Sequence, residues 1–190
     1  MHSDVIHAMC AALESKDPIS AKHCKNVAKM TKRFCETQSF SAIQRSILED
    51  AANIHDVGKI GIPEAVLNFP GRLGEFGFVL IHAHSEIGAH IASSGGLSEP
   101  VINCILHHHE QWDGEGYPLG LKGDAIPYEA RVIAVFDSID AMCGQRYYRK
   151  PVFLQKCREE IGQCAGSRYD PEIVQLVLNN WDFIIESLYE

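Results

Sequence analysis

The segment NIHDVGKIGIP, residues 53–63, holds the most informative cluster of polar residues in the chain. His55 and Asp56 adjoin at the expected end of a helix, and Gly58 allows the chain to turn and bring Lys59 back toward the same place. An imidazole nitrogen and a carboxylate oxygen suit a divalent metal ion, and the two oxygens of a carboxylate can bridge two ions. A histidine–aspartate pair by itself is more often a surface or capping pair, so its meaning depends on the rest of the chain.

The sequence on both sides of this segment predicts helices almost throughout. Apolar residues recur at helical spacing, and glycine or proline separates the helical segments. The run RVIAVF could form a buried strand, but its continuation into DSIDAMC favours a helix. We therefore expect an all-α fold. The expected helices cover residues 3–15, about 20–34, 42–55, about 75–94, 100 to about 111, 128 to about 143, and 171 onward, with an irregular loop at 113–127.

Composition predicts one globular domain spanning residues 1–190. The 190 residues are 46% apolar, which is enough for one sizeable core. No apolar run has the roughly 20 residues of a membrane helix, and the N-terminus lacks a signal sequence, so we expect no membrane segment and a cytoplasmic location. The seven cysteines form no CxxC pair and are expected to be reduced core residues. The formal charge of -8 argues against a nucleic-acid polymer as partner.

Several segments together resemble the HD-GYP domain, a subgroup of the HD phosphohydrolase superfamily. They are HD within residues 53–63, HHE and WDGEGYP within 108–118, GLKGDAIPYEARVIAVFDSIDA at 120–141, and RYYR at 146–149. The resemblance covers a core of about residues 3–180. It implies an HD-domain helical bundle with a GYP loop, which hydrolyses cyclic dinucleotides, chiefly cyclic di-GMP, at a centre of two or three metal ions.

The resemblance implies seven metal ligands that hold two divalent ions. Nitrogen and carboxylate ligands suit iron or manganese. Asp56 is the expected bridge and Lys59 the expected contact to the substrate phosphate, so both are candidate catalytic residues. Ile19 stands where members with three metals carry a glutamate, which argues against a third ion. The seven ligands are His23, His55, Asp56, His84, His108, His109 and Asp137.

The other polar residues considered are not expected to bind metal. Asp140 is expected to orient a neighbouring ligand rather than bind metal. Each of the seven ligands, taken singly, would more often be an ordinary polar, capping or helix-end residue. The remaining histidines have no matching role and are expected at the surface or behind the ligands: His2, His7, His82, His90 and His107.

The substrate side is expected to involve the DGEGYP loop and a basic segment. The loop glycines allow the backbone to pass close to a flat ligand, and Tyr117 offers a stacking face. Arg146 and Arg149 match basic family positions, and guanidinium groups bind phosphates well. The alternatives are a loop that only packs and a solvated basic helix end.

The expected reaction is hydrolysis of a cyclic dinucleotide to the linear dinucleotide, with further cleavage to mononucleotides left open. Three other interpretations remain. They are an HD-type phosphohydrolase acting on a nucleotide or alarmone, a metal-dependent oxygenase on the same scaffold, and a non-catalytic interaction module. The resemblance also allows for a receiver, sensory or diguanylate cyclase partner domain.

Overall fold

A computed structural model describes residues 2–143 and 154–189, and the regular secondary structure of these residues is helical. Within these ranges, pairing between extended segments is limited to one isolated bridge between Ala165 and Tyr169. The all-α fold predicted from the sequence is confirmed.

The helices follow one another with short connections. In chain order they are α1 (His2–Lys16), α2 (Pro18–Thr37), α3 (Ala42–Ile54), η1 (Val57–Gly61), α4 (Glu64–Leu67), α5 (Glu75–His82), α6 (His84–Ser94), α7 (Glu99–His107), η2 (Gly123–Ala125), α8 (Tyr128–Cys143), α9 (Leu154–Gln163), α10 (Pro171–Asn179), α11 (Trp181–Glu186) and η3 (Ser187–Tyr189). The η elements are single 3-10 turns or slightly longer.

Side-chain caps explain where the main helices begin. The carboxylate of Asp17 accepts hydrogen bonds from the backbone of Ile19 and Ser20, and Pro18 occupies the first turn of α2. Ser41 begins α3 with a reciprocal capping box. These caps fix the α1–α2 turn and the start of α3. Helix α2 carries His23, and His55 directly follows α3.

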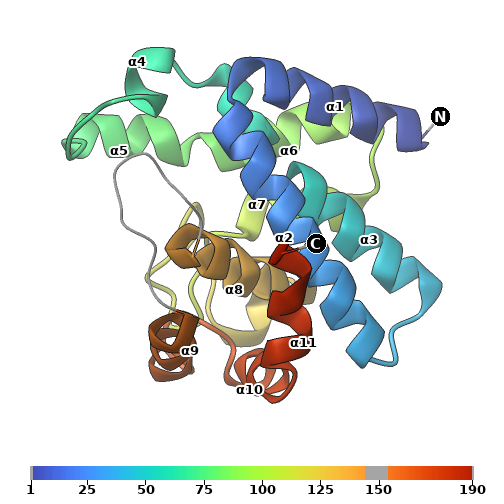
Figure 1. Cartoon of the computed structure of the whole chain (residues 1–190). Helices are drawn as coiled ribbons and strands as arrows, with labels where there is room; N and C mark the ends of the chain where they lie inside the picture. The colour runs from blue at the N-terminus through green and yellow to red at the C-terminus, as the bar shows by residue number, and fades with distance from the viewer. Residues whose placement is uncertain (1, 144–153, 190) are drawn as a thin grey trace.

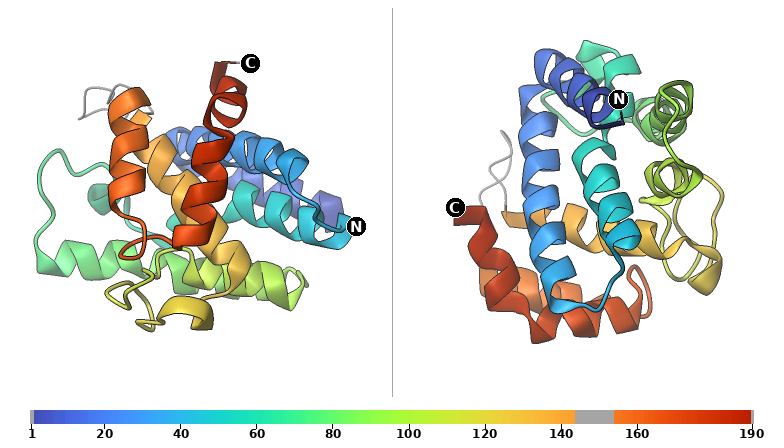
Figure 2. Two further views of the ribbon diagram at one scale, coloured as in Figure 1. Left: turned by 90° about the horizontal axis from the view of Figure 1, so that it is seen from below. Right: turned by 90° about the vertical axis from the view of Figure 1, so that its right-hand side faces the viewer.

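The helices pack as a bundle around α2, α3 and α8. Figure 2 shows α2 and α3 side by side, with α8 crossing them. Helices α6 and α7 pack together, α10 packs on α8, and α11 packs on α2 (Figure 1). The metal-ligand candidates lie where α2, α3, α6, α7 and α8 come together.

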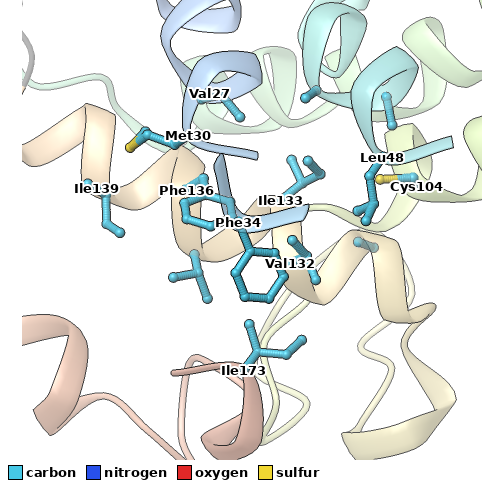
Figure 3. Packing of buried hydrophobic residues seen from close by; sticks show 14 of the residues in the cluster. Val27, Met30, Phe34, Leu48, Cys104, Val132, Ile133, Phe136, Ile139 and Ile173 are labelled. Carbon is cyan, nitrogen blue, oxygen red and sulfur yellow. The ribbon is translucent and has the colours of Figure 1, made fainter. Parts of the chain in front are cut away.

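The apolar core holds these helices in place. Phe34 of α2 and Phe136 of α8 meet edge to face, with their ring centroids 5.5 Å apart. Val27, Met30 and Ile133 surround them and are fully buried (Figure 3). Burying each large apolar side chain contributes roughly 1.5–3 kcal/mol, so this contact fixes the relative position of α2 and α8.

Some helix boundaries predicted from the sequence are wrong. The single helix expected at about 75–94 is two helices, because Ala83 ends α5 and α6 starts at the next residue. The helix expected to run to about residue 111 ends at His107, where the chain turns into the GYP loop. The long helix expected from residue 171 is interrupted at Asn180, and α9 was not predicted.

Within the described residues, none of the helices combines the length and apolar character that crossing a membrane requires.

Candidate metal centre

The seven predicted metal ligands form two adjoining groups. Within each group, one ligand atom from every residue lies within 4.8 Å of the others. The chain brings them together from distant helices, because His55 directly follows α3, His84 begins α6 and His108 directly follows α7. The first group contains Asp56, His84, His108 and His109, and the second contains His23, His55 and Asp137.

Three of the histidines are oriented in the same way. In His55, His84 and His108, the ring Nδ1 lies 3.0, 2.5 and 2.7 Å from the carbonyl oxygen three residues earlier. A carbonyl oxygen only accepts hydrogen bonds, so each Nδ1 carries the hydrogen and each Nε2 carries the lone pair. A hydrogen bond from the other ring nitrogen to a backbone carbonyl is the usual support of a histidine that binds metal.

These Nε2 atoms face other nitrogen atoms. His84 Nε2 lies 3.3 Å from His108 Nε2, and His55 Nε2 lies 3.4 Å from His23 Nε2. The lone pairs of His84 and His108 at this distance repel each other unless a cation or a proton lies between them. The donor set of imidazole nitrogens and carboxylate oxygens therefore fits divalent metal ions.

Asp56 belongs to the first group and also faces the second. Its Oδ1 is 3.4 Å from His84 Nε2 in the first group. Its Oδ2 is 3.8 Å from His55 Nε2 and 4.0 Å from His23 Nε2 in the second group. Lys59 donates to the same Oδ2 at 2.5 Å. Each carboxylate oxygen thus faces a different group, as a bridging ligand requires.

The electrostatics of the site favour the protonation states of metal ligands. Burial lowers the pKa of His84 and of His108 to about 4, and it also lowers the pKa of His55 and His109. Burial alone would raise the pKa of Asp56, but the Lys59 ammonium and the nearby histidines hold that pKa well below its usual range. At neutral pH these four imidazoles are neutral and the Asp56 carboxylate is ionised, so all five side chains can bind metal.

His23 is held by two carboxylates. Its Nδ1 donates to Asp140 at 2.6 Å, and its Nε2 lies 2.8 Å from Asp137 Oδ1. Burial acts to lower the pKa of His23, but the hydrogen bonds to the two aspartates raise it to about 9. Asn26 donates to the other oxygen of Asp140 at 2.8 Å and fixes that carboxylate. Asp140 therefore orients His23, as expected, and Asn26 is a further supporting residue that its spacing three residues after His23 could have indicated.

The GYP loop folds back tightly on the end of α7. The buried carboxylate of Glu110 accepts hydrogen bonds from the backbone nitrogens of Leu119 and Leu121 at 2.8 and 3.0 Å. At Gly116, a β-carbon would lie 2.2 Å from the backbone nitrogen of Gln111. Glycine is therefore required at this position by lack of space, and the loop is fixed beside the metal ligands.

His82 lies behind a ligand candidate, which is one of the two positions expected for it from the sequence. Its ring stacks on Tyr117, with centroids 3.7 Å apart and an angle of 9° between the planes. Tyr117 also stacks on His109, at 4.8 Å and 27°. Tyr117 thus packs against a metal-ligand candidate, and its role as a stacking face for substrate stays a prediction. The contact joins residues far apart in the sequence, so periodicity gave no signal for it.

A cavity of about 330 Å³ opens onto the two groups. Asp56, Lys59 and Tyr117 line it, together with ligand candidates of both groups. Arg168 and Tyr169 also line it and were not predicted, although Arg168 supplies a guanidinium group next to the site. The cavity has room for part of a phosphate-containing ligand beside the metal-ligand candidates.

Other predicted residues lie apart from the two groups or outside the described ranges. His107 is buried and belongs to neither group, in agreement with expectation. Arg146 and Arg149 lie outside the described residues. Cys24 lies within ligand distance of His55 and Asp56, but burial raises the pKa of its thiol well above the usual value and so disfavours the thiolate.

Known proteins resemble this chain in both sequence and fold. The family model described as HD domain matches residues 7–173. A 3'3'-cGAMP-specific phosphodiesterase 2 of Vibrio cholerae is 31% identical over 96% of this chain and 35% of its own length. A cyclic di-GMP phosphodiesterase of Thermotoga maritima is 35% identical over 92% of this chain and 48% of its own length. The chain therefore spans between a third and a half of the length of these curated relatives.

A solved structure agrees with this family assignment at the level of the fold. The crystal structure of a cyclic GMP-AMP specific phosphodiesterase of V. cholerae, V-cGAP3, superimposes with a TM-score of 0.71. The match covers 97% of this chain and 50% of that chain, at 19% identity. Because the family model covers most of the sequence, the chain belongs to the HD domain family, and its motifs resemble those of the HD-GYP subgroup.

Proposed function

We propose that the chain is a metal-dependent phosphodiesterase that hydrolyses cyclic di-GMP or a related cyclic dinucleotide to the linear dinucleotide. The observation that carries this proposal is the position of Asp56, whose two oxygens face two separate groups of ligand candidates. The names of the relatives support the same class of substrate. Further cleavage to mononucleotides remains open.

The two groups would hold two divalent metal ions, with Asp56 as the bridge. Iron and manganese both suit the mixture of imidazole and carboxylate ligands. Metal ions in such a site lower the pKa of a bound water and polarise the phosphate. Ile19 brings no carboxylate to the start of α2, which argues for two ions rather than three.

The protein's own residues would position and stabilise the substrate. Lys59 has a side chain only 15% exposed and lines the cavity, so its ammonium would offset the negative charge that develops on the phosphate. Asp140 keeps His23 in the orientation that a ligand needs. Tyr117, Arg146 and Arg149 stay candidates for substrate contacts. A cytoplasmic location and a receiver, sensory or diguanylate cyclase partner also stay predictions, as does a single domain over residues 1–190.

The test is hydrolysis of cyclic di-GMP and of its mixed guanine–adenine relative by protein loaded with iron or manganese. Chromatography would separate the cyclic substrate, the linear dinucleotide and the mononucleotides. We expect linear product with metal and none after chelation. Absence of product with every metal and both substrates would refute the proposal and favour the interaction-module interpretation. Oxygen consumption without phosphodiester cleavage would favour the oxygenase interpretation.

A further inference from the structure

A second cavity, of about 570 Å³, adjoins the first. Lys59 and Ile81 line both cavities, so the two spaces meet at the proposed phosphate contact. The rest of the second cavity is lined by the α1–α2 turn, by His23 of α2 and by the α4 region. Figure 1 shows the turn and α4 near the top of the molecule. A substrate whose phosphate lies at Lys59 therefore has space on both sides of that phosphate.

Part of the lining of the second cavity is suited to a flat, apolar ring. Ile19 from α2, Leu67 from α4 and Ile81 from α5 supply aliphatic side chains from three different elements. Ile19 is 38% exposed although it is a large apolar residue, so it is available for contact with a ligand. Aliphatic walls of this kind stack on a purine base, and the cationic side chains of Lys16 and Lys59 line the same cavity.

The polar lining of this cavity includes an acid that no other described residue engages. Glu64 and Asn68 lie one turn apart, at the start of α4 and just after its end, and both line the cavity. No hydrogen bond or ion pair among the described residues engages either side chain. The other nearby acid, Asp17, already accepts three hydrogen bonds as the cap of α2. Glu64 is therefore the carboxylate available to a ligand here.

We propose that the second cavity is a subsite for one guanine base of the cyclic dinucleotide, with Glu64 as the residue that selects guanine. This inference rests on the proposed function, because a cyclic dinucleotide places its two bases on either side of the reacting phosphate. The Watson–Crick edge of guanine presents two neighbouring donors, N1–H and the N2 amino group, which a carboxylate accepts together. Adenine presents an acceptor at N1, which repels a carboxylate. Ile19, Leu67 and Ile81 would hold the faces of the base.

The test compares Glu64→Gln with the parent protein on cyclic di-GMP and cyclic di-AMP. We expect kcat/KM for cyclic di-GMP to fall about tenfold or more, the scale of one bidentate contact to a base, while kcat/KM for cyclic di-AMP changes less than about threefold. Glu99→Gln is the matched control, because Glu99 is also an exposed acid in the first turn of a helix and lines neither cavity. It should leave both values unchanged.

A binding measurement separates this inference from the proposed function. Calorimetry on chelated protein, in which no turnover occurs, would give the affinity for each nucleotide. We expect Glu64→Gln to weaken cyclic di-GMP about tenfold and to spare cyclic di-AMP. If the parent hydrolyses cyclic di-GMP but Glu64→Gln affects both nucleotides equally or neither, the guanine subsite is refuted and the proposed function stands. If the parent shows this selective binding without hydrolysis, the subsite stands and the proposed function fails. If neither nucleotide binds or reacts, both are refuted.

Discussion

Replacing Gly58 by alanine should separate Asp56 from His84 within the first group of ligand candidates. Gly58 lies in η1, and a β-carbon there would lie 1.9 Å from the carbonyl oxygen of His84 and 2.5 Å from the backbone nitrogen of Gly88. An ordinary contact begins near 3.4 Å, so η1 and α6 would have to move apart by about 1.5 Å. Because Asp56 and Lys59 adjoin Gly58 while His84 belongs to α6, this movement lengthens the distance between Asp56 and His84.

Two effects of Gly58→Ala follow from this displacement. Overpacking of this kind costs about 1–3 kcal/mol, which for a chain of this size lowers the melting temperature by roughly 2–12 °C. A displacement of about 1 Å in a catalytic site costs on the order of 100-fold in rate. We therefore expect a clear loss of stability, of bound metal and of any cyclic dinucleotide hydrolysis.

The assay is a thermal melt followed by circular dichroism, combined with elemental analysis of the purified protein. Gly74→Ala is the control, because a β-carbon at Gly74 would have no neighbour within 4 Å. The control should keep the melting temperature and metal content of the parent. If Gly58→Ala also kept the melting temperature and metal content of the parent, the close contact between η1 and α6 would not be needed to hold the ligand candidates in place. That result would refute the reasoning.

Four further changes test the site. Asp56→Ala should remove most of the metal by elemental analysis, because a bridge serves two ions; full metal content would contradict this. Lys59→Met should keep metal and melting temperature but lower turnover of cyclic di-GMP by about 10²-fold to 10³-fold, and a rate equal to the parent would exclude Lys59 from the mechanism. Arg146→Ala should weaken cyclic dinucleotide binding by roughly tenfold to hundredfold in calorimetry with metal content unchanged; equal affinity would make it a solvated residue. In chelated protein, the free energy of unfolding should fall as the pH drops from 6.5 to about 4, because His84 and His108 take up protons when the chain unfolds. Denaturant titrations at several pH values would measure this free energy. A value that does not change with pH would contradict the burial of neutral imidazoles.

Most helices could be predicted because their apolar faces repeat at helical spacing, as at Val27, Met30 and Phe34 of α2. The break at Ala83 could not be predicted, because residues 75–94 contain no proline and are helix-compatible on both sides. The break depends on the position of α5 at the outside of the bundle, where none of the α5 residues is buried. Helix α9 could have been found, since Leu154, Cys157 and Ile161 follow a helical pattern.

The ligand candidates could be predicted from the motifs, but their arrangement could not. Nothing in the spacing of His23 and Asp137, more than 100 residues apart, indicates that they share a group. The stacking of His82 on Tyr117 and the cavity beside Glu64 likewise depend on tertiary packing. Local patterns identify residues suited to a metal site, whereas only the packed helices determine which of them face one another.

The most direct test of the central claim is a metal titration of chelated protein. Mn²⁺ or Fe²⁺ would be added in steps, with bound metal and the rate of cyclic di-GMP hydrolysis measured on the same samples. The account predicts two bound ions per chain and a rate that reaches its maximum as the second ion binds. Full hydrolysis by metal-free protein, or saturation of the rate with a single bound ion, would contradict the two-metal centre bridged by Asp56.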